Sequence, residues 1–237
     1  STLDRSSAAS DVYKRQIQPS QSDYFQATKG GAHGDFHLIV LAPNSVQEMH
    51  DFVFDAFDLA FKYRNPVMIL SDGVIGQMME KVVLADQRPR RTAEEIIAQD
   101  GDWALTGKTA DRKEHVITSL ELDPYAQERF NEKLIAKYAK IRENEVRYEE
   151  FMTEDADYII VAFGSAARIC RMTVEMAREA GYKVGLVRPI TLYPFPSKVL
   201  HDLAARGVKG FLSAELNHGQ MVEDVRLAVN GQAPVEH

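Results

Sequence analysis

The chain has 237 residues, of which 45% are hydrophobic and 27% are charged, and its formal net charge is −7. This length suits one large or two modest domains, and the composition is that of an ordinary soluble globular protein. The acidic balance argues against nucleic-acid binding, which needs clustered Lys and Arg, and no apolar run is long enough to span a bilayer.

Cysteine usage narrows the chemistry further. The single cysteine, Cys170, excludes a disulfide or a cysteine-ligated iron–sulfur cluster within the chain. We interpret it as a small buried residue on a helix rather than as a nucleophile, because no His lies near it in sequence. A cytoplasmic location fits these properties.

The first residues read differently from the rest. Residues 6–16 (SSAASDVYKRQ) show neither hydrophobic periodicity nor a capping pattern, and they match the translation of a transposase adapter used in shotgun metagenomic libraries. We therefore expect residues 1–16 to be a non-native tail and native sequence to begin near Ile17, in mid-protein. A natural disordered basic tail is the alternative. Residues 233–237 end without a closing element, so we expect truncation at both ends.

A βαβ unit is predicted next. Residues 36–41 are a short apolar run, after which Ser45 and Glu48 form a capping-box pattern before a helix. Asn65-Pro66 ends that helix, and residues 67–70 predict a second buried strand in a parallel sheet. Ser71-Asp72-Gly73 turns the chain at the strand's carboxyl end, where ligands bind in open α/β sheets.

The middle of the chain has a weaker pattern. Residues 82–122 read as a linker, with a short strand or loop at residues 103–106. Asp123-Pro124 opens a long polar helix that we expect to end around Phe151. Its thin apolar stripe favours a solvated linker helix over a coiled coil.

The last third predicts a second α/β domain with the order βαβαβα. The predicted strands are residues 158–163, 183–187 and 209–214, and the predicted helices are residues 166–180, 199–206 and 219–229. Residues 189–196 form a rigid crossing segment in this scheme. The turn at Gly164-Ser165 could bind an anion through backbone N–H groups, but we favour close helix–strand packing at Gly164.

Two loops concentrate polar groups and glycines. Residues 29–35 precede a strand and contain Gly30, Gly31, His33 and Asp35, which favour a loop docking on a cofactor or another subunit over a metal site. A plain surface loop is the open alternative. Residues 215–220 follow the last predicted strand. We expect this second loop to be a functional loop near a cofactor or another subunit, and its candidate residues are Glu215, Asn217, Gly219 and Gln220. No catalytic set and no metal site stands out from the residues themselves.

Several blocks, taken in order, resemble the α subunit of 2-oxoacid:ferredoxin oxidoreductases. They are residues 17–35, 40–43, 45–49, 65–67, 70–72, 162–165, 188–189, 192–196 and 215–220. Residues 23–28 (DYFQAT) and 30–35 (GGAHGD) are similar to the branched-chain, 2-oxoisovalerate type, although Ala32 stands where a third glycine is expected.

The resemblance implies an α/β fold with two domains. Residues 17–85 would be the C-terminal part of a thiamine pyrimidine-binding parallel-sheet domain. Residues 86–156 would be a linker and long helix, and residues 157–237 a truncated transketolase C-terminal-like domain. The pyrimidine-activating glutamate and the arginine for the substrate carboxylate would lie upstream of Ile17, so that Gln18 and Ser20 are the substrate-binding candidates in this chain.

The resemblance also implies an activity and its partners. The complete enzyme would convert 2-oxoisovalerate to isobutyryl-CoA on thiamine diphosphate, with coenzyme A as substrate and ferredoxin as electron acceptor. A β subunit would share the thiamine diphosphate and its Mg, and the iron–sulfur clusters would lie on partner subunits, among them γ and ferredoxin-like subunits. This chain alone would be inactive. The alternatives are a 2-oxoglutarate- or pyruvate-specific member, a transketolase- or pyruvate-dehydrogenase-β-like protein, and a non-catalytic assembly module.

Overall fold

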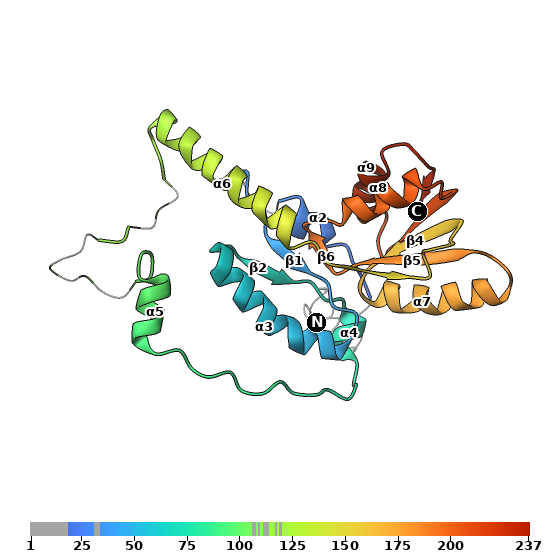
Figure 1. Cartoon of the computed structure of the whole chain (residues 1–237), viewed down its shortest axis with the longest axis horizontal. Helices are drawn as coiled ribbons and strands as arrows, with labels where there is room; N and C mark the ends of the chain where they lie inside the picture. The colour runs from blue at the N-terminus through green and yellow to red at the C-terminus, as the bar shows by residue number, and fades with distance from the viewer. Residues whose placement is uncertain are drawn as a thin grey trace, which may run out of the picture. The chain divides into compact units, whose positions relative to one another are not determined.

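The computed structural model describes residues 19–30, 34–105, 108, 110, 114–116, 118 and 120–237, so the tail expected to be adapter-derived lies outside them. Two compact units are distinguished (Figure 1): residues 1–83 with 134–237, and residues 84–133. The domain boundaries expected from the sequence stay a prediction.

The first sheet contains the predicted βαβ unit. Strand β1 (Ile39–Leu41) leads into helix α3 (Val46–Tyr63), and β2 (Val67–Ile69) returns parallel to β1, with Val40 opposite Met68. The strand order is β2-β1-β6, so β1 is central and fully buried while β2 is at the edge and half-buried. The parallel unit is confirmed, but the expectation of a buried second strand is wrong because β2 has a neighbour on one side only.

The third strand of this sheet comes from far along the chain. Strand β6 (Thr191–Tyr193) pairs antiparallel with β1, and the Ala42 N–H donates to the Ile190 carbonyl at 2.8 Å. The sequence predicts only a crossing segment here, which is wrong for these three residues. A run this short carries no readable period, so its strand form depends on the partner that it meets.

Helix α3 begins as predicted but its capping box does not close. The Ser45 hydroxyl accepts the Glu48 N–H at 3.1 Å. The Glu48 carboxylate accepts the N–H of Asn44 at 2.8 Å rather than that of Ser45, and it pairs with buried Arg188. The predicted reciprocal bond is therefore wrong, because an ion pair to the second sheet holds the glutamate.

The second sheet has the order β3-β5-β4-β7-β8. Its strands are β3 (Tyr148–Phe151), β4 (Tyr158–Ala162), β5 (Val184–Pro189), β7 (Gly210–Ala214) and β8 (Val235–Glu236). Strands β4, β5, β7 and β8 run parallel, and β3 is antiparallel to β5. The predicted parallel α/β arrangement of this part is confirmed.

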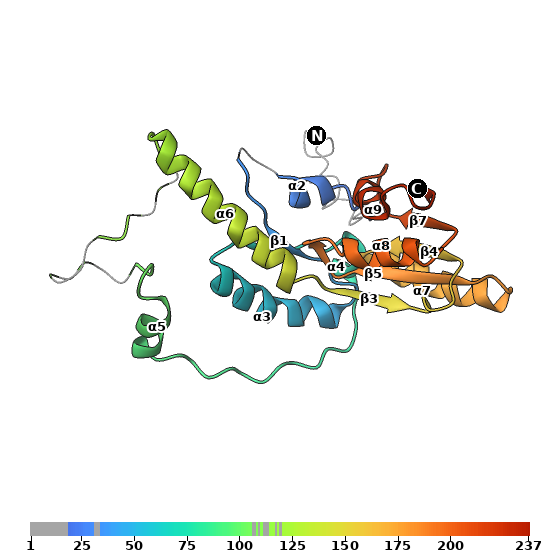
Figure 2. The same cartoon turned by 45° about the horizontal axis from the view of Figure 1, so that its top comes forward.

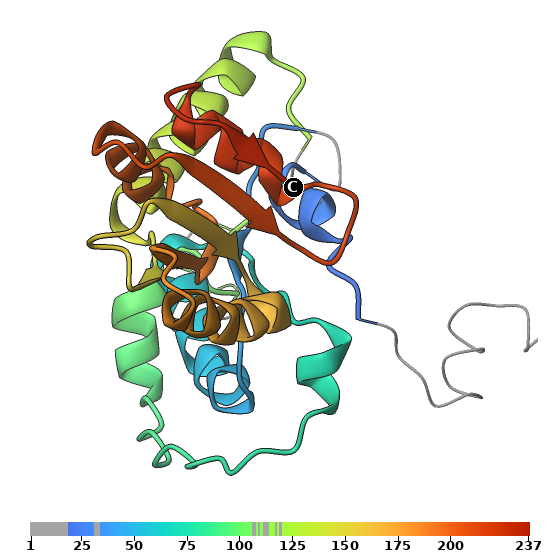
Figure 3. The same ribbon diagram turned by 90° about the vertical axis from the view of Figure 1, so that its right-hand side faces the viewer.

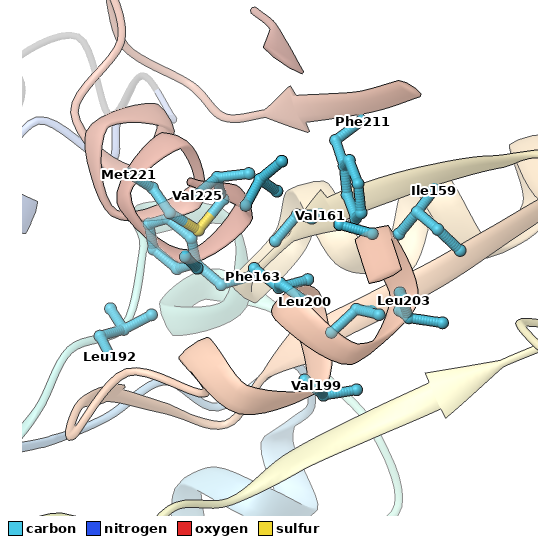
Figure 4. Packing of buried hydrophobic residues seen from close by; sticks show 14 of the residues in the cluster. Ile159, Val161, Phe163, Leu192, Val199, Leu200, Leu203, Phe211, Met221 and Val225 are labelled. Carbon is cyan, nitrogen blue, oxygen red and sulfur yellow. The ribbon is translucent and has the colours of Figure 1, made fainter. Parts of the chain in front are cut away.

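Helices cover both faces of the second sheet (Figure 3): α7 (Gly164–Glu179) on one, α8 (Ser197–Ala205) and α9 (Met221–Val229) on the other. Alternate residues of β4 point to opposite faces of this sheet, because side chains along a strand alternate in direction. Ile159 and Val161 join the core with α8 and α9, as Figure 4 shows. Ile160 and Ala162 join the core with α7.

The C-terminal end of helix α6 and the last residues of the sequence differ from the sequence prediction. Helix α6 (Pro124–Asn144) starts as predicted, with the Asp123 carboxylate accepting the N–H groups of Tyr125 and Ala126. It ends before residue 151, because residues 148–151 form β3, where Glu149 pairs with Arg188. Residues 235–236 form β8, where no closing element was expected.

The unit of residues 84–133 is mostly exposed and contains one further helix, α5 (Ala93–Asp100). Thr92 and Glu95 form a complete capping box, and buried Asp100 pairs with Arg91 at 3.2 Å. The sequence pattern did not predict α5. No helix in the part of the chain that the structure describes is both long and apolar enough to cross a membrane.

Candidate functional site at the strand ends

Gln21 joins three segments that follow strands of both sheets. The residue is 4% exposed, and its side chain donates through Nε2 to the Phe163 carbonyl at 2.9 Å and to Asp72 Oδ2 at 3.4 Å. Its Oε1 accepts the Leu216 N–H at 3.0 Å, and its backbone N–H donates to the Leu216 carbonyl at 3.0 Å. The Asn217 amide donates to the Gln21 carbonyl at 3.0 Å. We call this set, with Gly164 and Ser165, the Gln21 junction.

The Asp72 carboxylate caps two helices at once. Its Oδ1 accepts the N–H groups of Val74 and Ile75 at 3.1 and 3.2 Å, which begins the short helix α4 (Gly73–Gln77). Its Oδ2 accepts the Ser165 N–H at 2.8 Å, at the first turn of α7. The free N–H groups and the dipole of a helix N-terminus favour an anion. The anion at the start of α7 is therefore a side chain of this same chain.

Gly164 permits this close approach. Its φ is +58°, and a Cβ added to it would lie 2.7 Å from Asp72 Oδ2 and 2.9 Å from Gln21 Nε2. Both distances are shorter than real contacts of a methyl carbon. The sequence favours close helix–strand packing at Gly164, whereas the close neighbours are the Asp72 and Gln21 side chains, and the Asp72 carboxylate is the anion that this turn binds.

The loop after β7 begins with an internal cap. The Glu215 carboxylate accepts the N–H groups of Gln220, Met221 and Val222 at 3.1, 2.8 and 3.0 Å. Ser213 donates its hydroxyl to Glu215 at 3.1 Å. Glu215 thus satisfies the first N–H groups of α9, which otherwise lack partners inside a helix.

The same loop holds the segment after Gln21. Gln220 donates to the Ser22 carbonyl at 2.9 Å and accepts the Phe25 N–H at 2.8 Å. Helix α2 (Tyr24–Thr28) lies beside α9 (Figure 2), where the buried Tyr24 hydroxyl donates to the Asp224 carboxylate. Burial and the Asp224 charge hold the pKa of Tyr24 well above its usual range, so this phenol remains a donor.

The predicted substrate-binding residues lie at the start of this segment. Ser20 is exposed, accepts the Ser22 N–H through its hydroxyl at 3.3 Å, and lines a small pocket with Gln21 and Asp72. Gln18 lies outside the described residues.

The predicted loop residues fall in two places. In the first loop, Gly30 has φ +99° and Asp35 is exposed, whereas Gly31 and His33 lie outside the described residues. In the second loop, Gly219 has φ +93° and donates its N–H to the Asn217 side chain at 2.7 Å. The structure brings Asn217 to the Gln21 junction and Glu215 and Gln220 to the adjoining turn.

Sequence reasoning did not single out Gln21, and it named Asp72 only as part of the turn at residues 71–73. Asp72 did carry a signal, because an acidic residue between a strand and a glycine is a typical N-cap. Gln21 carried none, since its partners lie at sequence separations of 51, 142 and 195 residues.

The residues present do not by themselves suit a metal-bound diphosphate. Across the described ranges, no group of three or more His, Cys, Asp or Glu side chains is placed to hold a metal ion. Cys170 is buried, and burial raises the pKa of its thiol, which disfavours the reactive thiolate. The arrangement suits positioning of a backbone segment rather than bond-making chemistry.

Family models match both parts of the chain. Residues 10–150 match the thiamine-diphosphate-binding domain of pyruvate flavodoxin/ferredoxin oxidoreductases, and residues 156–237 match core domain II of pyruvate:ferredoxin oxidoreductase. The first match begins inside residues 1–16, whose adapter origin stays a prediction.

Known relatives agree with these models. The chain is 50% identical over 212 residues to the ketoisovalerate oxidoreductase subunit VorB of Methanothermobacter marburgensis, covering 90% of this chain and 58% of that protein. It is 32% identical over 239 residues to the 2-oxoglutarate synthase subunit KorA of the same organism, covering 92% and 62%. The chain thus spans less than two thirds of the length of these relatives.

A solved structure supports the fold. The 2-oxoglutarate:ferredoxin oxidoreductase from Magnetococcus marinus aligns with a TM-score of 0.70 at 22% identity, over 93% of this chain and 42% of that one. The two family models together cover nearly all of the described residues, in the order that the sequence resemblance implies. The chain belongs to the 2-oxoacid:ferredoxin oxidoreductase family.

Proposed function

We propose that this chain is part of the α-type subunit of a thiamine-diphosphate-dependent oxidoreductase that converts 2-oxoisovalerate and coenzyme A to isobutyryl-CoA and CO2. Ferredoxin takes the electrons. One observation carries the choice of substrate: the chain is 50% identical to the ketoisovalerate subunit of M. marburgensis but 32% identical to that organism's 2-oxoglutarate subunit. Two subunits from one organism are a matched comparison, and the difference favours the branched-chain substrate.

The chain's own contribution is to position a substrate-binding segment. Gln18 and Ser20 contact the 2-oxoacid in this proposal, and the Gln21 junction fixes the backbone directly after them. A site of this kind needs its residues held to within a fraction of an ångström. The bonds from Gln21 to Phe163, Leu216 and Asn217 provide that support.

The two loops have different roles in this proposal. Gly30, Gly31, His33 and Asp35 lie near the cofactor or a neighbouring subunit. The second loop, with Glu215, Asn217, Gly219 and Gln220, binds the backbone of the segment that follows Gln18 and Ser20. The bonds of Asn217 to Gln21 and of Gln220 to Ser22 support this role.

The cofactors require partner subunits. Thiamine diphosphate supplies the decarboxylation chemistry when it is bound, and a β subunit shares it together with Mg. Iron–sulfur clusters lie on γ and ferredoxin-like subunits, and the assembly works in the cytoplasm. The described residues of this chain do not form the metal site of that cofactor.

The test is a substrate comparison on the assembled enzyme. The complete subunit, obtained by extending the reading frame in the source DNA, is purified with its partner subunits. Reduction of ferredoxin is measured with 2-oxoisovalerate, 2-oxoglutarate or pyruvate, each with and without coenzyme A. We expect kcat/KM to be highest for 2-oxoisovalerate and to require coenzyme A. A preference for 2-oxoglutarate or pyruvate refutes the substrate, and an assembly that binds no thiamine diphosphate refutes the enzymatic role.

A further inference from the structure

A second and larger pocket lies away from the Gln21 junction. It has a volume of about 770 Å³ and lies between the end of α6, strand β6 and the first turn of α8. It shares no lining residue with the small pocket beside Gln21. Small-molecule sites usually have volumes of about 300–1,000 Å³, so this pocket is of ligand size.

Three cationic and two acidic side chains line this pocket. The cations are Lys29, Arg142 and Lys198. Lys29 pairs with Asp224, and Lys198 pairs with Asp202. Arg142 is exposed and makes no ion pair with any residue that the structure describes.

Two acids also line the pocket. Asp224 binds Lys29 and the Tyr24 hydroxyl, and Glu143 adjoins Arg142 in sequence without an ion pair to it. A guanidinium presents a planar fork of donors that suits a carboxylate or a phosphate. Arg142 is therefore the group in this pocket that can bind an anion.

The wall of the pocket is aromatic. The rings of Tyr193 and His37 stack with centroids 4.3 Å apart and an angle of 12° between their planes. Phe195 and Tyr148 also line the pocket, and most of its surface is apolar. Aromatic faces of this kind favour a flat ring in the ligand.

One polar atom in this wall lacks a partner. His37 Nδ1 is buried and has no hydrogen-bond partner within the described part of the chain. Tyr193 Oη is buried too, but Arg142 lies beside it: burial raises the pKa of this phenol, and the charge of Arg142 and its hydrogen bond oppose that rise. Burial and the nearby Arg142 charge lower the pKa of His37, so the imidazole is neutral near pH 7 and one of its nitrogens accepts a hydrogen bond. Buried polar groups in folded proteins nearly always have a partner. A ligand that carries a donor would complete this wall.

We propose that this pocket binds a small aromatic anion, a carboxylate or phosphate whose ring carries a hydroxyl or amino group. The anionic group pairs with Arg142, and the ring lies along Tyr193 and Phe195. The ring substituent donates to His37 Nδ1. This site does not depend on the proposed catalytic function.

The test is direct binding to the intact chain, measured by isothermal titration calorimetry. The probes are 4-hydroxyphenylacetate and AMP, which separate an aryl carboxylate from a nucleotide as the source of this chemistry. Phenylacetate and inorganic phosphate are the controls that lack the ring donor or the ring. We expect one probe to bind with a Kd below about 1 mM and at least several-fold more tightly than its control.

Two variants locate the site. Arg142→Gln should raise the Kd at least about tenfold, as the loss of one charge-assisted bond predicts. Arg129→Gln, the same change at an exposed position of the same helix, should leave the Kd unchanged, and thermal melts establish that both variants fold. His37→Phe keeps a ring but removes the acceptor, and should weaken binding several-fold. The proposal would be overturned if neither probe bound saturably. It would also be overturned if inorganic phosphate bound as tightly as AMP, or if Arg142→Gln bound the probe as tightly as the parent chain.

Discussion

The two sheets of this chain differ in how completely they are enclosed. The five-stranded sheet has helices on both faces, and its central strand β4 is buried at four of five residues. The three-stranded sheet has one fully buried strand, β1, a half-buried edge strand, β2, and a third strand that comes from beyond β5. The first sheet thus depends on the part of the chain that forms the second, and the Gln21 junction joins the loops that follow both.

The largest expected effect is on the free energy of unfolding, and it differs between a substitution in the five-stranded sheet and one in the three-stranded sheet. Ile159→Ala in β4 removes a side chain that is 0% exposed, and should lower the free energy of unfolding by about 2–5 kcal/mol. Met68→Ala in half-buried β2 should cost about 1–2 kcal/mol, because less apolar area leaves water there. Urea unfolding followed by circular dichroism measures both. Equal costs would show that β2 is as enclosed as β4.

The second prediction concerns the Asp72 carboxylate, which accepts N–H groups at the starts of both α4 and α7. Asp72→Ala should destabilise the chain by about 2–3 kcal/mol, because it removes the α4 cap and leaves the Ser165 N–H without its acceptor. Asp72→Asn can keep the α4 cap through its remaining oxygen but places an NH2 group opposite Ser165, so it should cost about 1–2 kcal/mol.

The control for Asp72 is an exposed cap that touches one helix. Asp123 accepts N–H groups of α6 alone, and Asp123→Ala should cost about 1 kcal/mol or less. The measurement is again urea unfolding. If Asp72→Ala costs no more than Asp123→Ala, the bond between Asp72 and Ser165 adds nothing to the joining of the sheets.

The third prediction tests how closely the loops approach. Gly164→Ala places a methyl group 2.7 Å from Asp72 Oδ2 at a φ of +58°, so both strain and displacement of the carboxylate should destabilise the chain by about 2–3 kcal/mol. Gly181→Ala is the matched control, since Gly181 has φ +89° but open space around it, and should cost about 1 kcal/mol. A thermal melt of the two variants compares them, and equal shifts in Tm would contradict close packing at Gly164.

Local patterns predicted most of the second sheet and little of the junction. Strand β4 and helix α7 could be read from an apolar run, a glycine turn and a 3.6-residue period, because each of these signals is local. Strand β6 has three residues and β8 has two, and neither shows a period. Such strands are specified by the strand that they pair with, which sequence spacing does not reveal.

The candidate site shows the same limit. The polar loop at residues 215–220 was readable because it follows a predicted strand, but the partner that it holds, Gln21, is 195 residues away from Leu216. A single glutamine between serines looks like any surface residue. Its burial follows from the meeting of three loops, and only the fold reveals that meeting.

The smallest effect concerns His37, which precedes β1 and stacks on Tyr193 of β6. Burial and then the Arg142 charge lower its folded pKa below 6.5, with Lys29 acting in the same direction and the Thr28 carbonyl and Asp35 opposing it. The unfolded chain then takes up this proton more readily than the folded one, so stability from this group is complete above pH 6.5 and falls as pH falls toward the folded pKa. His37→Phe keeps a ring but cannot titrate, so the stability of the parent relative to this variant should decline below pH 6.5. Urea midpoints from pH 8 to pH 5 measure this difference. A constant difference over that range would mean that the His37 pKa is the same in the folded and unfolded chains. The imidazole would then be no more desolvated where it stacks on Tyr193 than it is in the unfolded chain.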